Sequence, residues 1–184
     1  ISSLINLKDS SLGSAVDLSD FRSQIDAIRI VHEILYQSNE VTHINIRDYF
    51  QNLLDTLFSS FTSASVRIEN KAENKTVRTK TALSLGLILN ELATNAIKYG
   101  FTGIAQENQQ ENRFSVALQE DNDTHRYIFT VSNTGRPFPE EIDLDNAETL
   151  GLRLISALVG QLDGTIELQK SPHPVFTIRF PLPE

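Results

Sequence analysis

Residues 87–101 read LILNELATNAIKYGF, an apolar helical pattern interrupted by carboxamides, a carboxylate and an amine. With 3.6 residues per turn, one face of this helix carries only apolar side chains. These are Leu85, Ile88, Leu89, Leu92 and Ala96. A narrow stripe beside this face is polar and consists of Ser84, Glu91, Asn95 and Lys98. The apolar face predicts a core helix, so the polar stripe needs a separate explanation.

Two interpretations of the polar stripe are open. A carboxylate, a carboxamide and an ammonium group on successive turns suit a hydrated magnesium ion and the phosphates it carries. Oxygen ligands hold this hard cation, and a lysine offsets the phosphate charge. The alternative is a solvated helix edge, on which Glu91 and Lys98 are only weakly coupled. The spacing alone does not separate these two interpretations.

The segments around this helix predict an α+β fold. Apolar spacing predicts a helix from Ile46 to Phe61, and alternation predicts a short strand at Val66 and Ile68. Thr79 is placed to cap the helix that contains the opening stretch. Further strands are predicted at 114–118, 127–131, TIELQ and VFTIRF, with a helix at about 150–162. This order predicts an antiparallel or mixed sheet with helices on one face, a two-layer α/β sandwich.

Residues 1–40 predict a partial helical hairpin, and residues 43–184 the globular domain. Apolar side chains recur at three-four spacing in the second half of the hairpin. They are Leu18, Phe21, Ile25, Ile28 and Leu35. So narrow a seam predicts a bundle completed by a second copy of the chain. One long helix lying on the globular domain fits the same pattern.

Composition narrows the class of protein. The chain has 184 residues, a net charge of −8 and no cysteine. The acidic balance argues against a nucleic-acid surface, and the lack of cysteine excludes disulfides and thiolate chemistry. The apolar runs are too short for a membrane span, so we expect a cytoplasmic protein without membrane contact. Because the chain starts at Ile1 and contains no methionine, we expect it to be a fragment.

The opening stretch resembles the N-box of the superfamily that includes gyrase, Hsp90, MutL and the histidine kinases. Three further stretches, ISSLINL, IRIVHEILYQS and TLGLRLISALVGQLDGTIEL, resemble histidine kinases of the second dimerisation-domain class and their HWE relatives. The resemblance covers nearly the whole chain in the same order. It implies a Bergerat-type ATP-binding domain at 43–184, preceded by part of a dimerisation and phosphotransfer hairpin at 1–40.

The resemblance also implies roles for the residues of the N-box. Glu91 matches the acidic residue that orients or activates the reacting group, which makes it the catalytic candidate. Asn95 matches the magnesium ligand. Lys98 and Tyr99 lie where contacts to phosphate and ribose are expected.

Three other motifs follow from the same comparison. In VSNTGRPFP, Asn133 takes the position of an aspartate that accepts a hydrogen bond from the adenine amino group. Gly135 matches the first glycine of that motif, and Pro137 replaces the second. In TLGL, which begins at Thr149, the nucleotide-binding candidates are Leu150, Gly151 and Leu152, where a helix N-terminus can hold an anion. Thr177 is the candidate in the last strand, although a structural role also suits a strand threonine.

Two functions are compatible with this reading. The first is a sensor histidine kinase of a two-component system, which binds ATP with Mg²⁺ and transfers the γ-phosphoryl group to a histidine upstream of Ile1. Its expected partners are a second copy of the chain and a response regulator receiver domain, and His32 is not its acceptor. The second is a pseudokinase or regulatory dimer module. It is favoured by Asn133, by Pro137 and by HPVFTIRF, which lacks the glycine that the family normally has before the last strand. An ATPase of the gyrase or MutL kind is disfavoured, because the connection from Thr134 to Thr149 is short.

Overall fold

The computed structural model describes residues 29, 33, 43–59, 66–101, 112–144 and 149–182. Most of the predicted hairpin at 1–40 therefore lies outside the described residues, as does Phe61. Arg29 and Glu33 are both helical, and an ion pair of 3.0 Å joins them one turn apart. This pairing is consistent with the predicted helix, but the extent of the hairpin stays a prediction.

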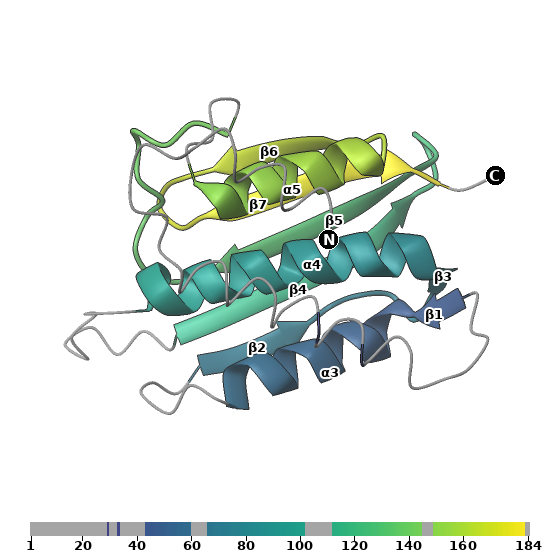
Figure 1. The fold of residues 1–184 in the computed structure, drawn as a ribbon, viewed down its shortest axis with the longest axis horizontal. Coiled ribbons are helices and arrows are strands. Elements are labelled where there is room, and N and C mark those ends of the chain that lie inside the picture. The colour runs from purple at the N-terminus through teal and green to yellow at the C-terminus, as the bar shows by residue number, and fades with distance from the viewer. Residues whose placement is uncertain are drawn as a thin grey trace.

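A five-stranded mixed sheet forms one layer of the fold (Figure 1). In spatial order its strands are β2 (Val66–Asn70), β4 (Asn112–Asp121), β5 (Arg126–Asn133), β7 (Val175–Pro181) and β6 (Thr165–Gln169). β2 runs parallel to β4, and every other neighbouring pair is antiparallel. Each strand appears where the alternation of apolar side chains predicted it.

Three helices lie side by side on one face of this sheet (Figure 1). They are α3 (Ile46–Ser59), α4 (Thr79–Asn95) and α5 (Leu150–Gln161), with α4 between the other two. The core fills the space between the two layers, because alternate strand residues such as Phe114, Phe129 and Ile178 are fully buried. The predicted two-layer α+β sandwich is confirmed.

The start of α4 differs from the prediction. The helix begins at Thr79 itself, and Arg78 holds the cap position without a side-chain capping bond. The reason is a small second sheet, in which β1 (His43–Asn45) pairs antiparallel with β3 (Thr76–Arg78). β3 runs directly into α4, so no loop residue is left to cap the helix. Strands of three residues are too short to show alternation in the sequence.

The end of α4 also departs from a regular helix. A π-helical turn, η1 (Ala96–Gly100), continues α4 and ends where the Phe101 N–H donates to the Ala96 carbonyl at 2.9 Å. Turns of this kind are often found at functional sites. Lys98 and Tyr99 lie on η1, so a regular helical projection does not give their directions.

Candidate functional site

A cavity of about 450 Å³ lies where η1, the end of β5, the first turn of α5 and the start of β7 meet. Its lining residues are Leu92, Asn95, Ala96, Tyr99, Gly100, Asn133, Arg136, Pro137, Phe138, Pro139, Ile142, Thr149, Leu152, Pro174 and Phe176. Most of these side chains are apolar, and Asn95 and Asn133 add two carboxamides. A mostly apolar pocket with a few polar groups is typical of a site for a small organic ligand.

The cavity brings together four of the nucleotide-binding candidates named from the sequence. Asn95 ends α4, Tyr99 lies on η1, Asn133 ends β5, and Leu152 lies in the first turn of α5. Tyr99 is 64% exposed, so its ring lies on the solvent side of the cavity. They come from three stretches that are distant in sequence, and the fold gathers these stretches around one cavity.

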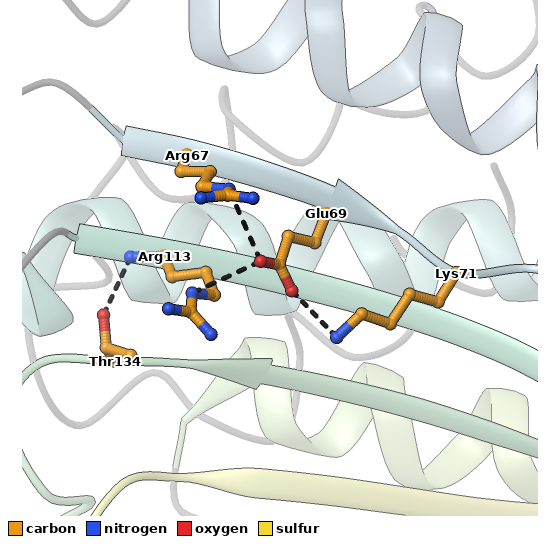
Figure 2. Close-up of polar contacts among 5 residues, drawn as sticks. All are labelled: Arg67, Glu69, Lys71, Arg113 and Thr134. Atoms are coloured by element: carbon orange, nitrogen blue, oxygen red, sulfur yellow. Dashed lines mark hydrogen bonds and ion pairs between the residues drawn. The ribbon is translucent and has the colours of Figure 1, made fainter.

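Asn133 is held by the backbone around it. Its side chain is nearly buried, and its Nδ2 donates to the Thr134 carbonyl at 3.2 Å. Thr134 is itself anchored to β4, because its Oγ1 accepts from the Arg113 N–H at 2.7 Å (Figure 2). The Thr134 N–H also donates to the Arg113 carbonyl at 2.9 Å. The bond through Nδ2 fixes which end of the amide faces the backbone. The other end is the oxygen, which can accept a hydrogen bond.

Two glycines allow the close approach of η1 to the residues after β5. A Cβ at Gly100 would lie 2.8 Å from Asn133 Nδ2, and a Cβ at Gly135 would lie 2.6 Å from the Gly100 carbonyl oxygen. Gly135 also has a φ of +138°, a backbone angle that residues with a side chain rarely adopt. The Arg136 N–H then donates to the Gly100 carbonyl at 3.2 Å. Gly135 does not line the cavity, but it permits the path of the residues that do.

Glu91 and Gly151 also lie against each other. Glu91 is only 8% exposed, and a Cβ at Gly151 would lie 2.8 Å from its Oε2. The carboxylate therefore packs on the first turn of α5, where the helix dipole favours negative charge. Neither residue is among those that line the cavity. Because Ser84 is buried as well, the interpretation of the stripe as a solvated edge is wrong for Ser84 and Glu91.

The N-terminus of α5 is capped by its own chain. Thr149 Oγ1 accepts from the Leu152 N–H at 3.4 Å, a side-chain cap that leaves fewer N–H groups for an added anion. Leu150, the first residue of α5, is half-buried and does not line the cavity. The first turn of α5 therefore contributes Thr149 and Leu152 to the cavity wall.

Lys98 and Thr177 are not among the residues that line the cavity. Lys98 is half-buried on η1 and is not a lining residue. Thr177 lies in β7 between the core residues Phe176 and Ile178, so its side chain is on the sheet face opposite the helices. There it is directly across from Thr130 of β5. The fold therefore does not bring Thr177 to the cavity.

The sequence patterns did not reveal one wall of the cavity, which is mainly apolar but includes the charged Arg136. This wall is built mainly by Arg136, Phe138, Pro139, Ile142, Pro174 and Phe176. The first four lie in a segment without helical or strand periodicity, where only the proline-rich RPFP signals a fixed path. Phe176 did carry a signal, because it is one of the alternating apolar positions of β7 that face the helices.

The oxygen atoms of the cavity side chains suit a magnesium ion only when a bound ligand supplies further oxygens. Among the described residues, no group of three His, Asp or Glu side chains is placed to hold a metal ion. Asn95 lines the cavity, and its side chain has one amide oxygen that could serve as a ligand. Magnesium often takes one or two protein oxygens and completes its shell with water and phosphate oxygens, so the residues fit a phosphate-carried ion.

Comparison with known proteins identifies the family. A family model described as histidine kinase-, DNA gyrase B-, and HSP90-like ATPase matches residues 80–184, more than half of the chain. The chain belongs to this ATPase family. A second family model, described as histidine kinase, matches residues 1–61. The resemblance to histidine kinases of the second dimerisation-domain class is confirmed.

Two sensor kinases of the family show similarity along most of this chain. Blue-light-activated histidine kinase 2 of Erythrobacter litoralis is 25% identical over 179 residues, which make up 92% of this chain and 49% of that protein. Sensor histidine kinase PdtaS of Mycobacterium tuberculosis is 22% identical over 148 residues, 79% of this chain and 28% of that protein. The chain thus spans no more than about half the length of these curated relatives.

Solved structures of the family share the fold. The histidine kinase domain of the EL346 blue-light activated histidine kinase from Erythrobacter litoralis superposes with a TM-score of 0.75 at 20% identity, covering 90% of this chain and 82% of that one. The catalytic domain of histidine kinase ThkA gives a TM-score of 0.60 at 16% identity, covering 78% of this chain and 97% of that one.

Within the described residues, no helix is both long and apolar enough to span a bilayer.

Proposed function

We propose that this chain is the ATP-binding part of a sensor histidine kinase in a two-component system. The observation that carries this proposal is the shared cavity of Asn95 and Asn133. One residue offers an oxygen to a phosphate-carried magnesium ion, and the other offers an acceptor to an adenine amino group. Both positions are those that the resemblance to histidine kinases implies.

The remaining lining residues suit the rest of the nucleotide. Phe138, Ile142 and Leu152 provide apolar contact for a planar base, and Tyr99 lies at the solvent side, where ribose and phosphates would leave the cavity. Lys98 adds a positive charge on the same turn as Tyr99. We assign Glu91 to the reacting group by resemblance, and its packing on Gly151 supports a part in positioning α5.

The reaction would transfer the γ-phosphoryl group of ATP to a histidine nitrogen. In such transfers the protein supplies mainly positioning and charge stabilisation, and magnesium neutralises charge on the phosphates when it is bound. Asn95 and Lys98 would hold the phosphate end, while Asn133 would fix the base. We expect a homodimer, as the histidine kinase model matched at residues 1–61 suggests, and a response regulator receiver domain as acceptor of the phosphoryl group.

A pseudokinase remains the second candidate, and three departures from the family motifs favour it. Asn133 is a neutral acceptor, Pro137 lacks the N–H of a glycine, and HPVFTIRF has no glycine before the last strand. Titration of the chain with Mg-ATP by calorimetry tests the two candidates. We expect saturable binding at one site per chain that Asn95→Ala weakens. A wild-type chain that binds no Mg-ATP would favour the pseudokinase.

A further inference from the structure

The cavity wall between β5 and α5 has no regular secondary structure of its own. Residues 135–142, which we call the wall segment, contribute Arg136, Pro137, Phe138, Pro139 and Ile142 to the cavity. Pro137 and Pro139 have no backbone N–H, so Phe138 carries the only donor between them. A segment so poor in internal hydrogen bonds must be held in place by its neighbours.

Most of these holding contacts come from one place, the turn between β6 and β7. We call residues 170–174 the hairpin turn. The Phe138 N–H donates to the Lys170 carbonyl at 3.0 Å, and Lys170 Nζ donates to the Glu140 carbonyl at 2.7 Å. The hairpin turn thus holds the middle of the wall segment through both the backbone and the side chain of Lys170.

His173 holds the beginning of the wall segment. Its Nδ1 lies 3.2 Å from the Gly135 carbonyl oxygen. Because a carbonyl can only accept, this contact is a hydrogen bond in the tautomer that carries its proton on Nδ1, which then donates. Just beyond the hairpin turn, the Phe176 ring meets the Phe138 ring edge-on, with centroids 5.6 Å apart. Pro174 and Phe176 also line the cavity, so the turn and the wall segment form one continuous surface.

We infer that the hairpin turn is a strap that positions the cavity wall, and that His173 and Lys170 are positioning residues of the site. Neither side chain lines the cavity, so each acts through the wall segment that it holds. A shift of the turn would move Phe138 and change the width of the cavity. The inference rests on the proposed function for the identity of the ligand, but the coupling of turn and wall does not depend on it.

The test uses two substitutions of His173. His173→Leu removes the donor and keeps much of the bulk, whereas His173→Asn places an amide N–H near the position of Nδ1. Hydrogen exchange of the Phe138 amide is measured without nucleotide, and the Leu182 amide, which donates to the His125 carbonyl, is the internal reference. We expect His173→Leu to speed exchange at Phe138 at least tenfold without change at Leu182. His173→Asn should stay within about twofold of wild type.

The second measurement is Mg-ATP affinity by calorimetry. We expect His173→Leu to weaken binding roughly tenfold with little change in melting temperature, and His173→Asn to restore it. Lys170→Met, which removes the bond to Glu140, should act in the same direction. His125→Asn is the matched control, because His125 lies in the exposed turn between β4 and β5 with a φ of 52°, which asparagine tolerates.

Two outcomes would overturn the inference. One is exchange at Phe138 that is the same in His173→Leu as in wild type. The other is faster exchange with unchanged Mg-ATP affinity, since the turn would then hold the wall without positioning the site. If the wild-type chain binds no Mg-ATP, the proposed function fails, and exchange at Phe138 alone decides whether the turn holds the wall.

Discussion

At the scale of single residues, the two carboxamides of the cavity differ in how tightly the fold binds them. Asn133 is nearly buried and is fixed through Nδ2 to the Thr134 carbonyl. Asn95 is half-buried at the junction of α4 and η1. Both residues are asparagines, so the sequence alone does not distinguish them. Of the two, only Asn133 has an amide nitrogen that is hydrogen-bonded to the backbone within the described residues. Substitutions at the two positions should therefore have different consequences.

We expect Asn133→Asp to tighten Mg-ATP binding while lowering the stability of the empty protein. A carboxylate would make a charge-assisted bond to the adenine amino group, about 1 to 2 kcal/mol or roughly tenfold in affinity. It would also lose the bond to Thr134 and bring two oxygens together, which costs about 1 kcal/mol. Calorimetry and thermal unfolding measure the two effects, and unchanged affinity would count against adenine recognition by Asn133.

Asn95→Ala should separate phosphate recognition from base recognition. Loss of the amide oxygen should weaken Mg-ATP binding and leave the binding of metal-free adenosine nearly unchanged. The melting temperature should move little, because the side chain is only partly buried. A variant that unfolds, or that loses adenosine as well, would show that Asn95 is a structural residue of the helix end.

At the scale of elements, the packing of α3 on α4 depends on one aromatic ring and one glycine. The Tyr49 side chain is 3% exposed, and its hydroxyl is a buried group without a hydrogen-bond partner among the described residues. A Cβ at Gly86 of α4 would lie 1.8 Å from that hydroxyl oxygen. Gly86 thus makes room for the ring, and burial raises the pKa of the Tyr49 hydroxyl.

We expect Tyr49→Phe to stabilise the protein and Gly86→Ala to destabilise it. Removal of an unpaired buried hydroxyl should raise the free energy of unfolding by about 1 kcal/mol. The added methyl group should cost about 1 to 3 kcal/mol, because the ring must move. Urea unfolding measures both, and combining Gly86→Ala with Tyr49→Leu should recover part of the loss. Equal losses with and without the ring would contradict this packing.

At the scale of the whole molecule, an ion cluster joins the edge of the sheet to its interior. Glu69 of β2 contacts Arg67 at 3.5 Å, Lys71 at 2.8 Å and Arg113 of β4 at 3.4 Å (Figure 2). Arg67 and Arg113 are directly opposite in register, a like-charge pair that costs stability unless a carboxylate lies between them. The hydrogen bond from Lys71 and the charges of the arginines lower the pKa of Glu69.

We expect Glu69→Gln to lower the free energy of unfolding at neutral pH. The same substitution should make that free energy depend less on pH in the acid range. A lowered folded-state pKa means that the unfolded chain binds the proton more readily. The stabilisation by Glu69 is therefore present above the unfolded pKa of about 4.3 and is lost as the pH falls through the folded value. Urea unfolding at pH 7 and about pH 3 measures this loss of stabilisation.

Glu167→Gln is the control, because Glu167 is 69% exposed and pairs only with Arg179 among the described residues. Equal effects of the two substitutions would contradict a special role for the cluster.

The sequence by itself determined the longer helices, the strands of the main sheet and the family. Apolar periodicity is a local property, so it predicted the helix at residue 87, the alternating strands such as β4 and β5, and the two-layer fold. The matched N-box and its neighbours likewise identified the histidine kinase relationship. Asn95 and Asn133 could be named as candidate site residues because they stand at matched positions of two family motifs, the N-box and VSNTGRPFP.

Only the tertiary structure decided how those residues meet. The π-helical turn redirects Lys98 and Tyr99, Glu91 packs on Gly151, and strand alternation sends Thr177 to the opposite face of the sheet. The wall of the cavity comes from segments near residues 138 and 174, which no local pattern connects. These arrangements depend on contacts between residues far apart in the sequence. Their free energy comes from packing and hydrogen bonds that exist only once the sheet and helices are assembled.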